Sequence, residues 1–320
     1  MSRVVSAAAL PFDVAAVLGD ATEYVAPAAG RMARDALLAA AADADALITL
    51  LRDEVNDALL DAAPRLRIVA NCAVGYDNVD VAACTRRGIA VTNTPGVLTE
   101  ATADFAFALM LAAARRVVEG DAMVRGGTWT GWEPGQLLGV PVAGATLGII
   151  GLGRIGQAVA RRARGFDMTV LYAGPREVAA AGELGARRVT LAELWAASDF
   201  VSVCCPLDDS THHIVDAAAL AAMKPTAILV NTSRGPCVDE AALARALADG
   251  IIARAGLDVY EREPDVDPGL RTSGRAVLAP HAGSATTTTR AKMAEICARA
   301  VRDALEGRRP ETVVNPEIYA

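Results

Sequence analysis

Short apolar runs recur along the chain, separated by alanine-rich stretches such as residues 31–42. Such runs, rich in valine, isoleucine and leucine, predict buried strands, and the stretches between them predict helices. Regular alternation of strand and helix predicts an α/β fold with parallel sheets. The strands expected before residue 99 are 4–5, 46–51, 66–70 and 89–92, and those expected after residue 145 are 146–150, 169–172, 200–203, 227–230, 255–257 and 276–278.

Two long helical stretches mark where one set of strands gives way to the other. Residues 93–96, Asn-Thr-Pro-Gly, end the first alternation, and Thr99 is the expected N-cap of a helix reaching about residue 118. A second long helix is expected from residue 285 to about 306. Because a bridging helix leaves the first set of strands near residue 100, we expect the last helix to return to it. The predicted domains are residues 1–98 with 286–320, and residues 99–285.

Three glycines follow the apolar run 146–150 at G-x-G-x-x-G spacing. Gly151 allows a tight turn, Gly153 lets a phosphate approach the backbone, and Gly156 lets the following helix pack close to the strand. The amides and dipole at the helix start attract phosphate, and Arg154 adds a charge there. A glycine turn without a ligand is the alternative, but the strand and helix on either side favour a dinucleotide-binding site.

Composition and charge narrow the class of protein. The chain has 320 residues and is 53% hydrophobic, which is enough for two hydrophobic cores. Its formal net charge of −7 argues against a nucleic-acid partner. The longest apolar helical stretch, 105–114, is too short to span a bilayer, and the N-terminus lacks a signal-peptide pattern. We therefore expect no membrane partner. The six cysteines show no metal-ligand spacing, so we also expect no bound metal and a reducing cytoplasmic location.

Three charged residues follow successive predicted strands of the second domain. Arg234, Glu263 and His281 would therefore face the same crevice as the glycine loop, beyond the carboxyl ends of the strands. A histidine can donate a proton near neutral pH, a nearby carboxylate favours its charged form, and a guanidinium can bind a substrate carboxylate. Singly, each residue could be structural or solvated, but the three together indicate catalysis. His212 and His213 have the sequence context of exposed or capping residues.

A series of motifs resembles the D-isomer-specific 2-hydroxyacid dehydrogenases, most closely the glyoxylate/hydroxypyruvate reductase branch. The motifs keep the family's order along nearly the whole chain. Glutamate at position 263 argues against the formate dehydrogenases of the same superfamily, which carry glutamine there. The matching segments are 71–80 (NCAVGYDNVD), 100–104 (EATAD), 129–132 (WTGW), 137–139 (LLG), 151–156 (GLGRIG), 231–235 (NTSRG), 256–260 (GLDVY), 263–264 (EP) and 280–284 (PHAGS).

The resemblance implies a fold and a set of roles. A Rossmann dinucleotide domain would be inserted into a flavodoxin-like substrate domain, and the family usually forms homodimers through the cofactor domain. His281 would be the general acid/base, Glu263 its orienting partner and Arg234 the substrate clamp. The expected substrate contacts are Val74, Gly75, Arg234 and Arg52, and the expected cofactor contacts are Thr102, Gly151, Gly153, Arg154, Ile155, Gly156, Arg176, Cys205, Pro206, Thr232, Asp258, His281 and Gly283.

The chain departs from the pattern of NAD-specific members at the end of the second strand of this domain. Those members place an acid there to bind the adenosine ribose, whereas this chain has Ala173, followed closely by Arg176. Without the acid, a 2′-phosphate meets no repulsion, and an arginine–phosphate contact contributes about 1.5–3 kcal/mol. We therefore expect NADP(H) to be preferred, with NAD(H) also possible. The alternative is that Arg176 is a solvated loop residue.

Two other functions compete with reduction of glyoxylate or hydroxypyruvate. A dehydrogenase of a larger 2-hydroxy acid, such as 3-phosphoglycerate, would need basic residues in the first domain, and Arg52 follows a strand there. Some relatives of the family are dinucleotide-sensing corepressors that act as binding proteins. Against that alternative, this chain keeps arginine, glutamate and histidine at the three positions expected for catalysis. Turnover of any 2-oxo acid would separate an enzyme from a sensor.

Overall fold

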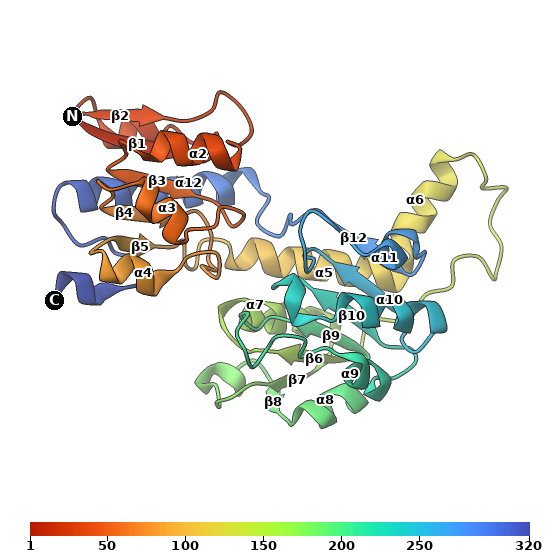
Figure 1. Ribbon diagram of the computed structural model, residues 1–320. Helices are drawn as coiled ribbons and strands as arrows, with labels where there is room; N and C mark the ends of the chain where they lie inside the picture. Colours follow the sequence, from red (N-terminus) through yellow and green to blue (C-terminus); the bar gives the residue numbers. More distant parts are fainter. The chain divides into compact units, whose positions relative to one another are not determined.

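The computed structural model describes residues 1–320 and divides the chain into two compact units (Figure 1). The first unit holds Met1–Leu98 and Ala285–Ala320, and the second unit holds Thr99–Ser284. The second unit is therefore inserted between two segments of the first. Each unit is built on its own parallel sheet.

The first unit contains a five-stranded sheet in the order β2-β1-β3-β4-β5. Every neighbouring pair is parallel, with Val4 opposite Ala46 and Ala46 opposite Ile68. This is the flavodoxin-like strand order, so the fold class predicted for this domain is confirmed. The strands are β1 (Ser2–Ser6), β2 (Thr22–Val25), β3 (Ala46–Thr49), β4 (Ile68–Asn71) and β5 (Ala90–Thr92).

Helices cover both faces of this sheet, and adjacent strand residues serve opposite faces. Val5 packs with α2, α3 and α4, whereas its neighbour Val4 packs with α1 and α12. Burial on both faces explains why the strands are apolar throughout instead of alternating with polar residues. The helices of the unit are α1 (Val14–Leu18), α2 (Arg34–Ala41), α3 (Asp57–Ala62), α4 (Val81–Arg86) and α12 (Thr287–Leu305), with a 3-10 turn η4 (Pro316–Tyr319). The last helix thus packs on the first sheet.

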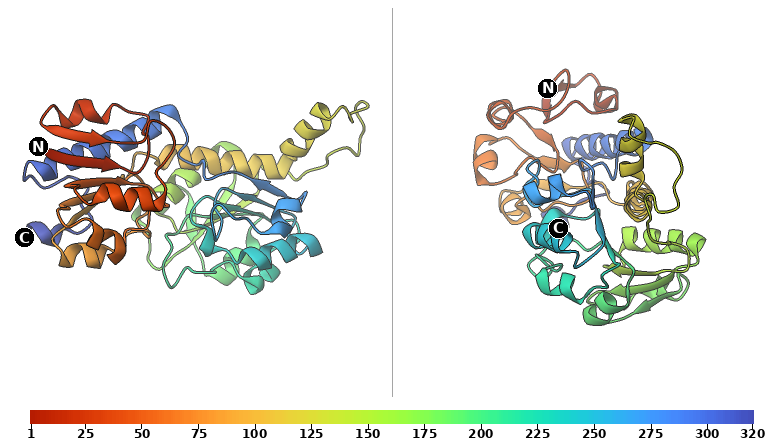
Figure 2. Two further views of the ribbon diagram at one scale, coloured as in Figure 1. Left: turned by 45° about the horizontal axis from the view of Figure 1, so that its top comes forward. Right: turned by 90° about the vertical axis from the view of Figure 1, so that its right-hand side faces the viewer.

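The second unit contains a seven-stranded parallel sheet in the order β12-β11-β10-β9-β6-β7-β8. The direction of progression reverses between β6 and β9, which is the Rossmann arrangement with its crevice at the carboxyl ends of the strands. Two views show α5 (Thr99–Arg115) and α7 (Arg154–Ala163) beside this sheet (Figures 1 and 2). The strands are β6 (Thr146–Ile150), β7 (Thr169–Ala173), β8 (Ala186–Arg188), β9 (Phe200–Val203), β10 (Ile228–Asn231), β11 (Arg254–Leu257) and β12 (Ala276–Leu278).

Two apolar layers enclose the second sheet. One layer includes α5 and α7, and the other includes α8, α9 and α10. Cys204 and Cys205 directly follow the end of β9. None of the chain's helices is both long and apolar enough to cross a membrane. The helices are α5 (Thr99–Arg115), α6 (Val117–Arg125), α7 (Arg154–Ala163), α8 (Leu191–Ala197), α9 (Ala217–Ala222), α10 (Glu240–Asp249) and α11 (Pro268–Thr272), with 3-10 turns η1 (Arg164–Phe166), η2 (Ala179–Ala181) and η3 (Gly235–Cys237).

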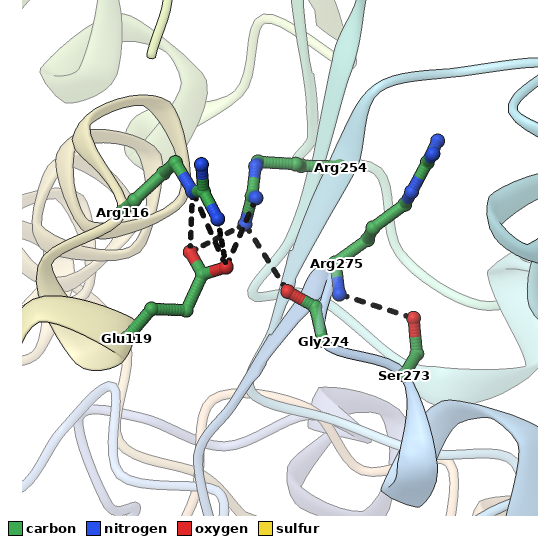
Figure 3. A network of polar contacts seen from close by, with 6 residues as sticks. All are labelled: Arg116, Glu119, Arg254, Ser273, Gly274 and Arg275. Atoms are coloured by element: carbon green, nitrogen blue, oxygen red, sulfur yellow. Dashed lines mark hydrogen bonds and ion pairs between the residues drawn. The ribbon is translucent and has the colours of Figure 1, made fainter. Parts of the chain in front are cut away.

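The helix expected from Thr99 to residue 118 is broken at Arg116. Arg116 has a left-handed backbone, with φ at 56°, so α5 ends before it and α6 starts after it in a new direction. Its guanidinium pairs with Glu119 at 3.0 Å, and Arg254 of β11 reaches the same carboxylate at 2.8 Å (Figure 3). Thr99 is the first helical residue of α5 and not its cap. Charge pairing, which the apolar pattern does not reveal, therefore accompanies the break.

Candidate active site

The predicted cofactor and catalytic residues of the second unit gather at one edge of its sheet. All seven strands are parallel, so the loops that follow their carboxyl ends share that edge. Thr102 of α5 lies beside the Gly283 loop, because a Cβ built on Gly283 would be 3.5 Å from the methyl carbon of Thr102. The glycine loop follows β6, Arg176 follows β7, Cys205 and Pro206 follow β9, Thr232 and Arg234 follow β10, Asp258 and Glu263 follow β11, and His281 and Gly283 follow β12.

The glycine loop is shaped to admit a phosphate group. Gly151 has φ at +91°, and a Cβ there would lie 2.8 Å from the Cys205 backbone. Gly153 stands at the N-cap of α7 with nothing within 4 Å of a Cβ position, and no side chain caps the helix. The helix start, formed by Arg154 and the half-buried Ile155, is therefore open to an anion. A Cβ on Gly156 would lie 2.2 Å from the Gly151 carbonyl oxygen, so helix and strand pack as the motif predicts.

Two further features suit a nicotinamide dinucleotide. The Thr232 hydroxyl is buried and has no hydrogen-bond partner within the protein, which fits a residue whose partner is a ligand. Ala173 ends β7 with 3% exposure, and Arg176 is exposed in the loop beyond it. The last residue of β7 is thus not an acid, and the one carboxylate of the loop beyond it is the exposed Glu177, directly after Arg176. The residues present fit the cofactor on both counts.

His281 and Glu263 form a hydrogen-bonded pair. His281 Nδ1 lies 2.9 Å from Glu263 Oε2 and 3.1 Å from Oε1, so the ring donates through Nδ1 and Nε2 is left for another partner. The Tyr260 amide donates to the same carboxylate at 3.2 Å. Burial raises the pKa of Glu263, but the His281 hydrogen bond and charge and the Tyr260 amide outweigh burial and lower it overall. Glu263 is therefore a stable anion that orients the imidazole.

Asp258 holds the loop that carries His281. Its Oδ1 accepts a hydrogen bond from the Ala282 amide at 2.6 Å and its Oδ2 one from the Gly283 amide at 2.7 Å, while its carbonyl accepts from the His281 amide at 2.8 Å. Burial raises the pKa of Asp258, although the two amides oppose the shift. His281 itself has a left-handed backbone, with φ at 54°. Asp258, expected only as a cofactor contact, thus also fixes the backbone that presents the histidine.

Arg234 lies in a loop that packs directly against the Glu263 loop. The Asn231 side chain donates to the Arg234 carbonyl at 2.9 Å, and the Arg234 guanidinium donates to the Ser233 carbonyl at 2.9 Å. A Cβ on Gly235 would fall 1.9 Å from the Tyr260 carbonyl carbon, so only glycine allows the two loops to approach this closely. The charge of Arg234 also contributes to the lowered pKa of Glu263. Arg234, Glu263 and His281 are therefore brought together.

One of the two neighbouring histidines, His213, differs from what its sequence context predicted. His212 is exposed and stacks on His213, with ring centroids 4.1 Å apart. His213 is half-buried and not exposed, and its Nε2 lies 2.5 Å from Glu261 Oε1. The Glu240 amide donates to the same Glu261 oxygen at 3.3 Å. The apolar pattern and spacing gave no signal for this pairing, which joins segments 48 residues apart.

The substrate contacts expected in the first unit lie after its strands. Asn71 donates to the Gly75 carbonyl at 2.9 Å and Asn93 donates to the Val74 carbonyl at 2.8 Å, which holds the loop after β4. The amides of Val74 and Gly75 donate no hydrogen bond within the protein, so they are available to an anion. Arg52 follows β3 and is exposed.

Comparison with known proteins identifies the family. The sequence model of the D-isomer specific 2-hydroxyacid dehydrogenase NAD binding domain matches residues 107–283. The chain belongs to the D-isomer specific 2-hydroxyacid dehydrogenases. A glyoxylate reductase of Korarchaeum cryptofilum (strain OPF8) is 54% identical over 280 residues, which cover 86% of this chain and 84% of the relative.

Solved structures agree with this family assignment. The TT0316 protein of Thermus thermophilus has a TM-score of 0.91 at 42% identity, covering 98% of this chain and 99% of that chain. An NADPH-dependent glyoxylate/hydroxypyruvate reductase of Sinorhizobium meliloti, solved with NADP and malonate, has a TM-score of 0.85 at 36% identity, covering 98% and 96%. The predicted family and its glyoxylate reductase branch are thus confirmed. This dehydrogenase is an oxidoreductase with a domain for a nicotinamide dinucleotide.

Proposed function

We propose that this dehydrogenase reduces small 2-oxo acids to D-2-hydroxy acids, with glyoxylate and hydroxypyruvate as favoured substrates and NADPH as the preferred reductant. The observation that carries the proposal is the His281–Glu263 pair, which stands beside Arg234 at the sheet edge that bears the glycine loop. Two similar proteins named above, from Korarchaeum cryptofilum and Sinorhizobium meliloti, are glyoxylate or glyoxylate/hydroxypyruvate reductases.

Each catalytic side chain has a task that follows from its chemistry. Glu263 fixes the proton on His281 Nδ1, so the Nε2 proton can pass to the carbonyl oxygen as negative charge develops there. Arg234 offers a planar fork to the substrate carboxylate, which orients the carbonyl. When bound, the reduced nicotinamide supplies the hydride that forms the new C–H bond at the carbonyl carbon. His281 regains its proton from solvent after the product leaves.

The chain's own residues would hold the cofactor along the same edge. The open start of α7, with Gly153, Arg154 and Ile155, suits the pyrophosphate. Arg176 suits a 2′-phosphate, and Thr232 offers its unpaired hydroxyl. Thr102, Cys205, Pro206, Asp258 and Gly283 complete the proposed contacts, and Val74, Gly75 and Arg52 stay predicted substrate contacts from the sequence resemblance.

Initial rates test the proposal directly. Absorbance at about 340 nm would be followed with NADPH and with NADH, each against glyoxylate, hydroxypyruvate, pyruvate and 3-phosphohydroxypyruvate. Fast oxidation of NADPH by glyoxylate and by hydroxypyruvate is the expected result. A preference for the phosphorylated acid would move the assignment to a larger-acid dehydrogenase and give Arg52 a role. Tight dinucleotide binding without turnover of any acid would instead favour a sensor.

We further propose that a second copy of the chain binds the segment formed by α6 and the loop that follows it. No residue of α6 is buried, and Trp132 in the loop is 81% exposed. The segment projects from the rest of the second unit (Figures 1 and 2). Such an apolar surface is typical of an interface, and the family resemblance implies a homodimer. A cytoplasmic location stays a prediction from the sequence.

Light scattering after size exclusion tests the homodimer. Wild-type protein should show twice the 33.0 kDa chain mass. Trp132→Asp should shift the mass toward that of one chain, because a charge replaces the most exposed aromatic side chain of the segment. Leu191→Asp, at an exposed apolar position of α8, is the matched control and should leave the dimer intact. Dissociation by both variants, or by neither, would contradict this interface.

A further inference from the structure

The carboxyl end of β7 is flanked by an arginine from the neighbouring strand that the sequence did not single out. Arg188 is the last residue of β8, which is the edge strand of the second sheet and pairs with β7. In the parallel register it lies opposite Tyr172, one residue before the end of β7 at Ala173. Its side chain is therefore placed where β7 gives way to the loop that carries Arg176.

Arg188 contacts that loop. Its Nη2 donates to the Gly174 carbonyl oxygen at 2.9 Å, one residue beyond β7. The other end of the loop is held by the Tyr172 hydroxyl, which accepts from the Val178 amide at 3.2 Å. Arg176 is thus presented by a short loop fixed at both ends, with Pro175 adding a restricted backbone angle. The two contacts preorganise the segment before any ligand binds.

The remaining donors of Arg188 are available. A guanidinium has five N–H donors, and the Gly174 bond uses one of them. The side chain forms no ion pair, and the residue is exposed. In a Rossmann unit the adenosine ribose lies at the end of this strand, so a 2′-phosphate would project over the same loop. Arg188 and Arg176 would then flank a doubly charged anion beyond Ala173, where two arginines outweigh Glu177, the one acid of this loop.

A charge on an edge strand has another ordinary explanation, which is protection of the open edge against pairing with another chain. That explanation applies equally to Arg187 and Arg188, since both are exposed on β8. Only Arg188 bonds to the β7 loop, whereas the charge of Arg187 acts on Glu193 of α8. Protection of the sheet edge therefore does not explain why Arg188, and not Arg187, bonds to the β7 loop.

We propose that Arg188 is a specificity-determining residue that binds the 2′-phosphate of NADP(H) together with Arg176. This rests on the proposed NADP(H) preference and adds a residue from a different strand to it. The ligand chemistry is a ribose 2′-phosphate monoester. Loss of one charge-assisted phosphate contact predicts about a tenfold weaker affinity.

Isothermal titration with two cofactor fragments provides the test and requires no turnover. The probes are 2′,5′-ADP, which carries the 2′-phosphate, and 5′-ADP, which lacks it. For Arg188→Ala we expect the dissociation constant for 2′,5′-ADP to rise about tenfold, with that for 5′-ADP changed less than about twofold. The matched control Arg187→Ala should change neither. Arg188→Lys, which keeps the charge but not the fork, should fall between wild type and Arg188→Ala.

The outcomes separate this inference from the proposed function. Equal weakening of both probes by Arg188→Ala would mean that Arg188 only holds the Gly174 loop, and would overturn the proposal. If Arg187→Ala and Arg188→Ala lost equal affinity for 2′,5′-ADP, the effect would come from overall positive charge, and the proposal would also be overturned. If wild-type protein binds the two fragments equally, the proposed NADP(H) preference is wrong, and so is the proposed role of Arg188. Turnover of glyoxylate by wild-type protein tests the proposed reaction separately, and none of these three binding results would change it.

Discussion

His213 and Glu261 form a second histidine–glutamate pair, two residues along the chain from Glu263. The His213 amide also donates to the Pro236 carbonyl at 2.8 Å, so this residue bonds both to the loop after Arg234 and to the loop that carries Glu263. The pair therefore connects the supports of two catalytic side chains without belonging to the reacting groups. Its removal should loosen their geometry.

For His213→Ala we expect kcat to fall about tenfold, because small misplacements of catalytic groups are costly. We also expect the melting temperature to fall by roughly 2–4 °C, which corresponds to loss of about 1 kcal/mol from a half-exposed hydrogen bond. Steady-state kinetics and calorimetry measure the two effects. His212→Ala, the exposed neighbour, serves as control and should match wild type. A kcat equal to that of the control would show that the pair has no bearing on catalysis.

His281→Ala should lower turnover at least a thousandfold or so, because the general acid is lost. NADPH binding, followed by fluorescence titration, should stay within about threefold of wild type, since the Asp258 bonds to the Ala282 and Gly283 amides do not involve the ring. Retained turnover would remove His281 from the mechanism. Loss of cofactor binding along with turnover would point to a collapsed loop instead.

Glu263→Gln keeps a hydrogen-bond acceptor for His281 but removes the charge. Reduction requires a proton donor, and an amide stabilises a neighbouring positive charge less than a carboxylate does, so we expect the pH profile of reduction to move to lower pH. Glu261→Gln, which removes the carboxylate paired with His213, is the control and should leave the profile in place. Superimposable profiles for wild type and Glu263→Gln would exclude this coupling.

The lowered pKa of Glu263 also predicts a stability change in acid. A carboxyl group whose folded pKa lies below its unfolded value stabilises the fold above the unfolded value, roughly pH 4.3. That contribution is lost as the pH falls through the lower, folded pKa. Thermal melts of wild type and Glu263→Gln should therefore converge in strong acid and differ at neutral pH. A constant difference at every pH would contradict the assignment.

Arg176→Ala should raise the KM for NADPH about tenfold, through loss of one phosphate contact, and leave the KM for NADH within about twofold. Steady-state kinetics with both cofactors at a saturating 2-oxo acid provides the measurement. An unchanged KM for NADPH would mean that Arg176, which is exposed, is a solvated loop residue and does not contact the 2′-phosphate.

The apolar pattern predicted most of both sheets because their central strands are buried on two faces. It missed β2 (Thr22–Val25) and β8 (Ala186–Arg188), which lie at sheet edges and carry half-exposed or charged residues. The glycine motif located the turn after β6 because its local geometry depends on small residues alone. The break at Arg116 was missed, since a left-handed residue held beside an ion pair leaves no mark in a helical pattern.

The candidate site was predictable where chemistry is local and unpredictable where it depends on contacts between loops. Arg234, Glu263 and His281 stood out because each follows a strand in a parallel sheet. The Asp258 bonds to the His281 loop and the close approach of Gly235 to Tyr260 arise only when separate loops fold together. His213 belongs to the same class, as its partner is remote in sequence.

Glu119 has a consequence for the assembly proposed above. α6 buries no side chain, and its carboxylate contacts with Arg116 and Arg254 are the charged links at its first turn. Burial raises the pKa of Glu119, but the two arginines outweigh burial and lower it, so these links persist through neutral pH and weaken in acid. Because the side chains of these contacts are only 15–30% exposed, dissolved ions screen them much less than they screen charges on the open surface. A dimer joined by the apolar side chains of this segment should therefore tolerate added salt and come apart on acidification, because protonation of Glu119 would free the segment that presents those side chains.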